Sequence, residues 1–221
     1  MIPEPVQRYL SHAMPDGAPL KSGALLAMEG RIKVGPWLSF DARQEFHGHD
    51  FTWRARAGVG RFRPLRVIDR YAAGEGSTEG RAFGRLRFLH AAGEDTSRAA
   101  AGRAAAESMW VPQTLLRSAG VCWRAESDAA IIATMDVPPE RPDVRFEIDP
   151  DTGALRSVSL LRWGDVGQDR FGYIPFGGTI HAEQRFGELV LPSRVTVGWW
   201  FGTPHYEPFF EAAIRSAEPI A

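Results

Sequence analysis

The stretch LSFDARQEFHGHDFTWRARA, residues 38–57, decides the fold class. The even-numbered positions of residues 38–46 carry Leu, Phe, Ala, Gln and Phe, whereas the odd-numbered positions carry Ser, Asp, Arg and Glu. In residues 51–57 the odd-numbered positions are the apolar ones. A period of two is that of a β-strand with one buried face, and the HGHD sequence between the runs is typical of a turn. The stretch therefore predicts a β-hairpin.

Similar β patterns continue on both sides of this hairpin. The other predicted strands cover about residues 63–72, 77–83, 120–126, 129–137, 143–149, 154–163, 179–186, 193–201 and 205–215. About ten strands at this spacing predict a mainly β fold, and residues 1–221 are expected to form one domain. Residues 171–178, FGYIPFGG, are predicted to be a loop rich in glycine and aromatic residues, either covering a cavity mouth or simply connecting two strands.

Two segments lack the alternation. Residues 1–20 predict an N-terminal helix, about residues 5–12, followed by a turn over residues 15–19. Residues 83–116 are rich in alanine and predict a helical insert between the two groups of strands. Its second helical piece is expected to begin at an N-cap formed by Asp95 or Thr96 and to run to about Met109, shortly before Pro112.

Composition excludes several partners. The chain of 221 residues has a net charge of −1 and no long block of like charge, so we expect neither nucleic acid nor an anionic membrane as a partner. No apolar run reaches the ~20 residues needed to span a bilayer, and the start does not resemble a signal peptide. These features predict a cytoplasmic protein without membrane insertion. The sequence does not indicate an oligomeric state.

Cofactor and metal motifs are also missing. The GVG and GEG sequences at Gly58 and Gly74 are not followed by predicted helices, so no dinucleotide cofactor is expected. The single cysteine, Cys122, lies in an apolar run and is predicted to be a buried, inert thiol. His47 and His49 would share one face of a strand, but they lie in the predicted turn without a third ligand nearby. We therefore expect no metal site.

One carboxylate stands out in the sequence AAAESMWVPQTLL, residues 104–116. Small side chains allow a helix to approach a sheet closely, so Glu107 would be partly buried there. A buried carboxyl group can serve as a general acid or base, which makes Glu107 a candidate catalytic residue. The alternatives are a solvent-facing glutamate and a buried structural ion pair, for example with Arg162. Trp110 is the expected anchor of the segment.

Large aromatic residues suggest an apolar ligand pocket. The chain has seven tryptophans, and adjacent Trp199 and Trp200 should point to opposite faces of a strand. Each aromatic residue alone is most simply explained by core packing, but a group of them could line a pocket. The predicted ligand-binding residues are Trp53, Tyr71, Trp110, Arg162, Phe176, Trp199 and Tyr206.

Several short motifs occur in an order that resembles a family of bacterial proteins of unknown function. They are PEPVQRYL at residues 3–10, FTWRAR at 51–56, IDRYAAGEG at 68–76, AAESMWVPQTLL at 105–116, VCWRA at 121–125 and VLPSRVTVGWW at 190–200. The resemblance implies a half-barrel similar to the lipoprotein-localisation-factor type, in which a curved antiparallel sheet wraps around one or two helices. Such half-barrels bind acyl chains or other apolar ligands. The chain departs from lipoprotein carriers because it lacks a signal peptide and a lipidated cysteine, which argues against periplasmic lipoprotein transport.

Three functions remain open. The first is binding of a hydrophobic small molecule or lipid in the concave pocket of the half-barrel. The second is a cavity-type enzyme, such as a cyclase, isomerase or hydrolase, with Glu107 as general acid or base and Arg162 or Arg54 placing an anion. The third is a structural or interaction protein without a pocket. The first two require a cavity of at least ~300 Å³, and without a cavity the third would be favoured. The position of Glu107 relative to the cavity bears on the second.

Overall fold

Strands dominate the computed structural model, which describes residues 2–15, 23–116, 119–167 and 169–220. In this part of the chain thirteen strands form one antiparallel sheet. The first six are β1 (Gly23–Lys33), β2 (Trp37–His47), β3 (Asp50–Val59), β4 (Phe62–Ala72), β5 (Glu75–Ala82) and β6 (Leu86–Ala92). The others are β7 (Cys122–Ser127), β8 (Ala130–Thr134), β9 (Asp143–Ile148), β10 (Leu155–Gly164), β11 (Gly172–Phe186), β12 (Leu189–Trp199) and β13 (Glu207–Ile220).

The predicted hairpin consists of β2 and β3. Their register pairs Phe46 with Phe51 and Gln44 with Trp53. The side chains of Phe46, Phe51 and Trp53 are buried on the same face of the sheet, as the alternation predicted. The mainly β fold class predicted from this pattern is confirmed.

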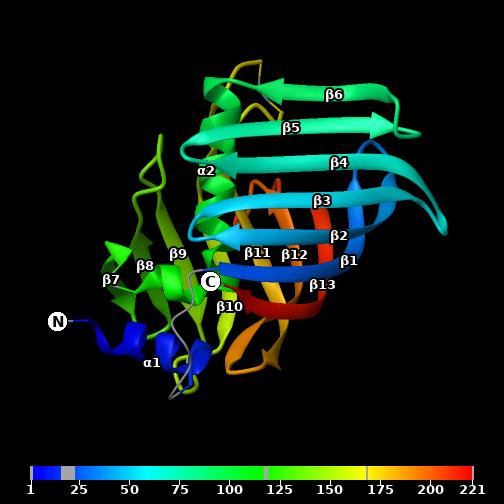
Figure 1. Cartoon of the computed structure of the whole chain (residues 1–221). Helices are drawn as coiled ribbons and strands as arrows, with labels where there is room; N and C mark the ends of the chain where they lie inside the picture. The colour runs from blue at the N-terminus through cyan, green and yellow to red at the C-terminus, as the bar shows by residue number, and fades with distance from the viewer. Residues whose placement is uncertain (1, 16–22, 117–118, 168, 221) are drawn as a thin grey trace.

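The sheet consists of two meanders, the first formed by β1 to β6 and the second by β7 to β13, which meet in the middle of the sheet. The strand order runs β6-β5-β4-β3-β2-β1-β13-β12-β11-β10-β9-β8-β7, so every neighbour in the sheet is also a neighbour in sequence except the β1–β13 pair. Figure 1 shows β2 to β6 stacked one above another, whereas β11 and β12 run in a crossed direction. The sheet is therefore strongly curved and remains open, with β6 and β7 at its two edges.

The helical insert joins these two edge strands. Because β6 and β7 lie at opposite edges, the chain between them has to cross the sheet, and it does so through α2 (Glu94–Glu107), η1 (Ser108–Trp110) and η2 (Pro112–Leu115). Helix α2 packs against β5 on one side and β10 on the other, and Figure 1 shows it standing in the hollow of the sheet. The half-barrel wrapped around a helix is thus confirmed.

Small residues bring α2 close to the sheet. The alanines of its buried face include Ala101 and Ala105, which are fully covered. On β5, a Cβ atom added to Gly76 would lie 2.7 Å from the carbonyl oxygen of Thr96, so only glycine fits at this contact. The backbone N–H of Gly76 donates a hydrogen bond to Oγ of Ser97 at 3.0 Å. This contact fixes the first turn of α2 on β5.

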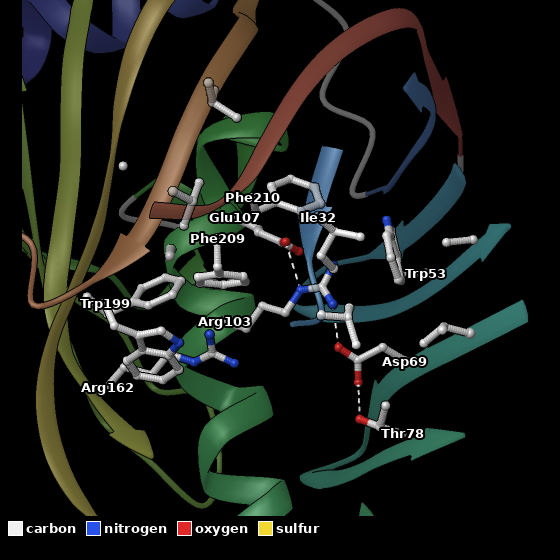
Figure 2. Close-up of a pocket in the computed structure, with 18 of the residues that line it drawn as sticks. Ile32, Trp53, Asp69, Thr78, Arg103, Glu107, Arg162, Trp199, Phe209 and Phe210 are labelled. Atoms are coloured by element: carbon white, nitrogen blue, oxygen red, sulfur yellow. Dashed lines mark hydrogen bonds and ion pairs between the residues drawn. The ribbon is translucent and has the colours of Figure 1, made fainter. Parts of the chain in front are cut away.

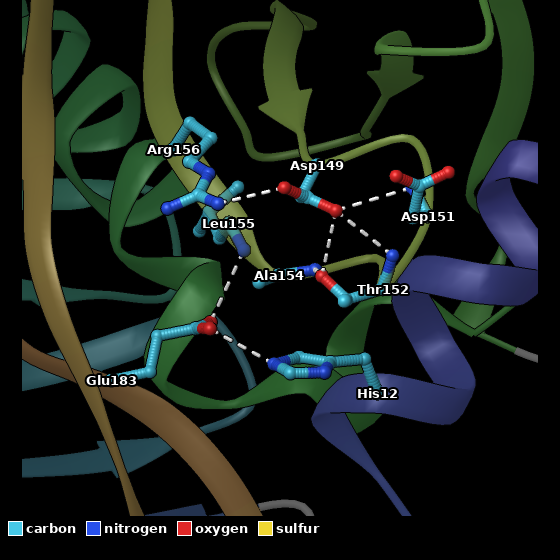
Figure 3. A network of polar contacts seen from close by, with 8 residues as sticks. All are labelled: His12, Asp149, Asp151, Thr152, Ala154, Leu155, Arg156 and Glu183. Atoms are coloured by element: carbon cyan, nitrogen blue, oxygen red, sulfur yellow. Dashed lines mark hydrogen bonds and ion pairs between the residues drawn. The ribbon is translucent and has the colours of Figure 1, made fainter.

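The N-terminal helix α1 (Glu4–Ala13) closes one end of the second meander. Its buried side chains include Val6, Tyr9 and Leu10, the stripe expected from the sequence. Nε2 of His12 lies 2.8 Å from Oε2 of Glu183 on β11, and the other oxygen of Glu183 accepts the backbone N–H of Leu155 at 3.2 Å (Figure 3). Helix α1 is therefore attached to β11 by a polar contact, while it packs against β7, β8 and β12. The turn predicted over residues 15–19 lies outside the described residues from position 16 onward.

The boundaries of the helical insert were predicted wrongly. Residues 86–92 form strand β6 and not the first helical piece, because the free edge of β5 supplies a hydrogen-bonding ladder for them. The N-cap of α2 is Gly93, with φ of 101°, and neither Asp95 nor Thr96 has this role. The end of the insert agrees better, since η1 and η2 replace regular helix around Pro112.

Three local predictions near strand ends were also wrong. Residues 172–178, expected to be a loop, belong to β11 and pair with β10, and residues 176–178 also pair with β12. Cys122 is exposed because β7 is an edge strand, and the next residue, Trp123, packs against the core instead. Trp200 does not continue β12: its φ of 58° is left-handed, so the chain turns there.

Candidate functional site

An apolar cavity of about 350 Å³ lies between α2 and the concave face of the sheet. Both meanders and the helix supply its walls, and Figure 2 shows α2 between the two groups of strands. Its apolar lining includes Ile32, Ala55, Val67, Met109, Val195 and Phe210. The volume falls in the range of small-molecule sites, ~300–1,000 Å³. The cavity that a binding protein or a cavity-type enzyme requires is therefore present.

Most of the predicted ligand-binding residues line this cavity. They are Trp53 on β3, Trp110 on η1, Arg162 on β10, Phe176 on β11 and Trp199 on β12. These residues are far apart in sequence and come together because the sheet curves around the helix.

Two of the predicted residues lie elsewhere. Tyr71 is buried beside Phe51, and its hydroxyl donates to the carbonyl oxygen of Pro138. Tyr206 precedes β13 and packs against Phe201, with a ring-centroid distance of 5.4 Å. Tyr71 is on the inward face of β4, but its ring is used to fill the core and not the cavity wall.

Glu107 lines the cavity at the C-terminal end of α2 and forms a largely buried ion pair, one of the alternatives left open by the sequence. Its partner is Arg103 and not Arg162, which was the example considered. Nε of Arg103 donates to Oε1 of Glu107 at 2.8 Å, and Nη1 of Arg103 donates to Asp69 on β4. The second oxygen of Glu107 accepts Nε2 of Gln44 at 2.6 Å. Asp69 also accepts the hydroxyl of Thr78 at 2.8 Å (Figure 2). We call Gln44, Asp69, Thr78, Arg103 and Glu107 the Arg103 cluster.

Arg103 remains charged in this setting. Burial lowers the pKa of its guanidinium, but the charges and hydrogen bonds of Glu107 and Asp69 outweigh burial, so the pKa rises above its ordinary value. The face of the guanidinium lies over the rings of Phe51, at 4.6 Å, and Trp53, at 5.4 Å. The Arg103 cluster therefore binds α2 to the first meander by ion pairs and by cation–π contacts.

The sequence contains signals for the members that were missed. Arg103 and Glu107 are four residues apart on a helix, the spacing at which side chains meet. Gln44 is the polar member of the otherwise apolar face of residues 38–46, and its side chain is fully buried. A buried polar group needs a hydrogen-bond partner, so Gln44 itself pointed to a polar site on the concave face.

Arg162 is the second cation of the cavity wall. Its Nε donates to the carbonyl oxygen of Ala99 at 2.9 Å, and within the described residues the side chain forms no salt bridge. The guanidinium lies 4.6 Å from the ring centroid of Phe176 and 5.0 Å from that of Trp199. Burial lowers the pKa of Arg162 to about 10, with Arg103 adding to the effect and Asp69 and Glu107 opposing it. Arg162 is thus cationic at neutral pH without a carboxylate in contact.

The two turn histidines are separated from this cavity. Nε2 of His47 lies 2.9 Å from Oε1 of Glu45 on the exposed side of β2. Burial lowers the pKa of His49, which follows in the turn. Over residues 2–15, 23–116, 119–167 and 169–220, no three His, Cys, Asp or Glu side chains are grouped as metal ligands. No described helix combines the length and apolar character required to cross a membrane.

Comparisons with known proteins bear on the fold. A family model described as "Family of unknown function (DUF6544)" matches residues 1–212. The crystal structure of a DUF1329 family protein from Desulfovibrio piger has a TM-score of 0.53 at 10% identity, covering 97% of this chain and 91% of that one. This likeness concerns the fold alone. No curated protein matches the chain.

Two further solved structures resemble the chain more weakly. A putative outer membrane lipoprotein-sorting protein domain from Vibrio parahaemolyticus gives a TM-score of 0.47 at 6% identity, covering 97% of this chain and 90% of that one. A LolA superfamily protein from Nitrosomonas europaea gives 0.44 at 7% identity, covering 98% and 92%. The family match by itself confirms the resemblance to a family of unknown function that the sequence motifs indicated.

Proposed function

The chain belongs to the family of unknown function DUF6544, and on that premise we propose that it binds a hydrophobic small molecule or acyl chain in the cavity beneath α2. The observation that carries this proposal is the cavity of about 350 Å³ with a largely apolar wall. Protein interiors are normally close-packed, and an unfilled apolar space costs stability. A space kept open between a helix and a curved sheet is what a ligand-binding site requires.

The polar groups of the wall support binding more than catalysis. The two oxygens of Glu107 already accept hydrogen bonds from Arg103 and Gln44. Both oxygens are therefore engaged in structural contacts, which reduces the number of lone pairs left for proton transfer with a ligand. Glu107 nevertheless lines the cavity beside an arginine, which is the position expected of it in an enzyme. A cavity-type enzyme acting on a hydrophobic metabolite therefore remains the second candidate.

Native mass spectrometry of the purified protein tests the binding proposal. We expect either a copurified apolar molecule or stoichiometric uptake of added laurate. If only the apo mass is observed, and neither laurate nor a hydrophobic dye binds, the proposal is wrong.

A cavity-filling variant locates the site. Ala57 on β3 lines the cavity, so Ala57→Leu should weaken laurate binding by about ten-fold or more, because the added atoms occupy the space of the ligand. Ala125→Leu, at an exposed position of β7, is the matched control and should leave laurate binding unchanged. Equal binding by the two variants would place the ligand outside this cavity.

The catalytic alternative has its own test. If a substrate is found, Glu107→Gln should abolish turnover while ligand binding persists, since glutamine keeps the shape of the side chain but cannot transfer a proton. Undiminished turnover by this variant would exclude Glu107 as general acid or base.

A further inference from the structure

Arg162 has hydrogen-bond donors that the described protein does not use. The only hydrogen bond of its side chain in this part of the structure is from Nε to the carbonyl oxygen of Ala99. A guanidinium has five N–H donors, so four remain on the two terminal nitrogens. Arg162 lines the cavity, and its terminal nitrogens are not among the buried polar atoms, so they are accessible to a ligand there. These donors can therefore form hydrogen bonds with an acceptor on a ligand inside the cavity.

The protein holds Arg162 in a fixed orientation. Its aliphatic stem lies against Gly102 of α2, where an added Cβ would come within 2.9 Å of Cγ of Arg162. The guanidinium is held between the hydrogen bond to Ala99 and the rings of Phe176 and Trp199. Figure 2 shows Arg162 beside Trp199. A guanidinium fixed in this way is preorganised for a ligand, because little conformational freedom is lost on binding.

The nearby carboxylates are already neutralised or hydrogen-bonded by other groups. Asp69 is paired with Arg103 and Thr78, and Glu107 is paired with Arg103 and Gln44. Two carboxylates against one guanidinium leave the Arg103 cluster with one negative charge in excess. Neither carboxylate contacts Arg162 among the described residues, so its terminal nitrogens remain available to an anionic head group.

We infer that the ligand is an amphipathic carboxylate, whose head group binds the terminal nitrogens of Arg162 while its apolar part fills the cavity. The inference rests on the proposed function and specifies its ligand class. A carboxylate presents two coplanar acceptors that match the two parallel N–H donors of a guanidinium. An alcohol offers no such pair of acceptors, and an amine brings a second positive charge to Arg162.

Three ligands with the same alkyl chain test the head group. Laurate, lauryl alcohol and laurylamine differ only there, and near pH 8 the acid is ionised and the amine protonated. By isothermal titration calorimetry we expect the wild-type protein to bind laurate at least about ten-fold more tightly than lauryl alcohol, the margin of one charge-assisted hydrogen bond. Laurylamine should also bind more weakly than laurate, because its head group has no acceptor for Arg162.

Variants assign this preference to Arg162. Arg162→Gln should reduce the preference for laurate over the alcohol to below about three-fold by weakening laurate binding alone, and Arg162→Lys should retain part of it. Arg43→Gln removes an exposed cation from the opposite face of β2 and should leave the preference unchanged. Equal affinity of wild-type protein for laurate and the alcohol, or a preference that survives in Arg162→Gln, would overturn the inference.

A measurement on the wild-type protein is independent of how the variants fold. Laurate with a ¹³C-labelled carboxyl group, titrated by NMR in the complex, should show a carboxyl pKa below that of free laurate, because the Arg162 guanidinium favours the ionised form. An unchanged or raised pKa contradicts the inference. Tight binding of both laurate and the alcohol, blocked by Ala57→Leu, would overturn it while leaving the proposed function intact. Failure of all three ligands to bind would count against the proposed function itself.

Discussion

At the scale of single residues, Arg103 forms salt bridges with two carboxylates on the concave face, those of Asp69 and Glu107. The side chains of Arg103, Asp69 and Glu107 are each less than a fifth exposed. We expect Arg103→Met to lower the free energy of unfolding by about 3–5 kcal/mol, because both carboxylates lose their counter-ion while remaining buried. Urea denaturation followed by tryptophan fluorescence measures this loss.

Arg145 provides a matched control for that substitution. It also pairs with two carboxylates, Glu126 and Glu147, but on a more exposed part of the sheet. Arg145→Met should change the free energy of unfolding by less than about 1 kcal/mol, as exposed ion pairs usually do. Equal losses in the two variants would show that Glu107 and Asp69 are solvated, and the Arg103 cluster would then have no special structural role.

Trp110 is the single residue that anchors the end of the insert. It is 2% exposed, and its Nε1 donates to the carbonyl oxygen of Pro192 on β12 at 3.0 Å. Trp110→Ala should therefore cost about 3–5 kcal/mol of unfolding free energy, measured by thermal or urea denaturation. Trp37→Ala, at the partly exposed start of β2, is the control and should cost clearly less. A loss below about 1 kcal/mol for Trp110→Ala would mean that η1 does not hold the helix on the sheet.

Sequence reasoning found individual cavity residues better than it found their partners. Glu107 and Trp110 stood out because they interrupt a run of alanines, and both line the cavity. Glu107 contacts Arg103 and Gln44, and Arg103 in turn contacts Asp69, so these contacts join α2, β2 and β4. No local pattern in the sequence states which strands face a helix. Arg162 was selected correctly as a cavity residue but was given the wrong partner.

At the scale of elements, the β9–β10 turn is stabilised by one carboxylate. Asp149 accepts hydrogen bonds from Arg156, from the backbone and hydroxyl of Thr152 and from the backbone of Asp151 (Figure 3). The Arg156 guanidinium and the Thr152 donors hold the pKa of Asp149 well below its ordinary value. A carboxyl group whose pKa is lower in the folded state stabilises the fold above its unfolded pKa, near 4, and loses this contribution as the pH falls.

Asp149→Asn should therefore lower stability at neutral pH and lower it less in acid. The urea midpoint of the variant is expected below that of the wild-type protein at about pH 7, and the gap should narrow as the pH falls below about 4. The side chain of Asp151, in the same turn, forms no hydrogen bond within the described residues, so Asp151→Asn serves as the control with no pH-dependent gap. A gap of constant size from neutral to acid pH would show that the charge of Asp149 is not what stabilises the turn.

Elements with one buried face were predicted well, and elements without one were not. Strands β2, β3 and β9 alternate between buried and accessible side chains, so their period is visible in the sequence. Strand β6 has almost entirely exposed side chains, and its existence depends on the ladder offered by β5. Strand β11 contains adjacent glycines, where an added Cβ at Gly177 would meet the carbonyl oxygen of Val158 at 2.5 Å. The close approach of the neighbouring strand requires glycine at this position of β11. The segment is therefore rich in glycine, which is otherwise typical of a loop.

At the scale of the whole molecule, the pairing of β1 with β13 unites the two meanders. All other neighbours in the sheet are hairpin partners, which turn signals in the sequence can indicate. The β1–β13 pair joins residues almost 200 positions apart, such as Gly23 and Ile220, and its register is set by the shared core. This pairing places β6 and β7 at opposite edges, so the insert has to cross the concave face and the cavity forms beneath it. The position of the site thus follows from topology.

The same topology predicts where a ligand should slow hydrogen exchange. The cavity is lined by α2, β3, β4 and β10 to β12 among other elements, whereas α1 and β7 to β9 contribute no described residue to its lining. A ligand seated there stabilises the closed state of α2 by a factor of 1 + [L]/Kd, so at a free laurate concentration of about 100 times Kd its locally opening amides should exchange up to ~100-fold more slowly. The comparable amides of α1 serve as the internal control and should change little. Hydrogen–deuterium exchange with mass spectrometry measures both segments in one experiment.

Protection confined to α1 and β7 would place the ligand outside the cavity. Equal protection everywhere would reflect global stabilisation without identifying a site. Protection centred on α2 is what a helix covering a filled half-barrel requires.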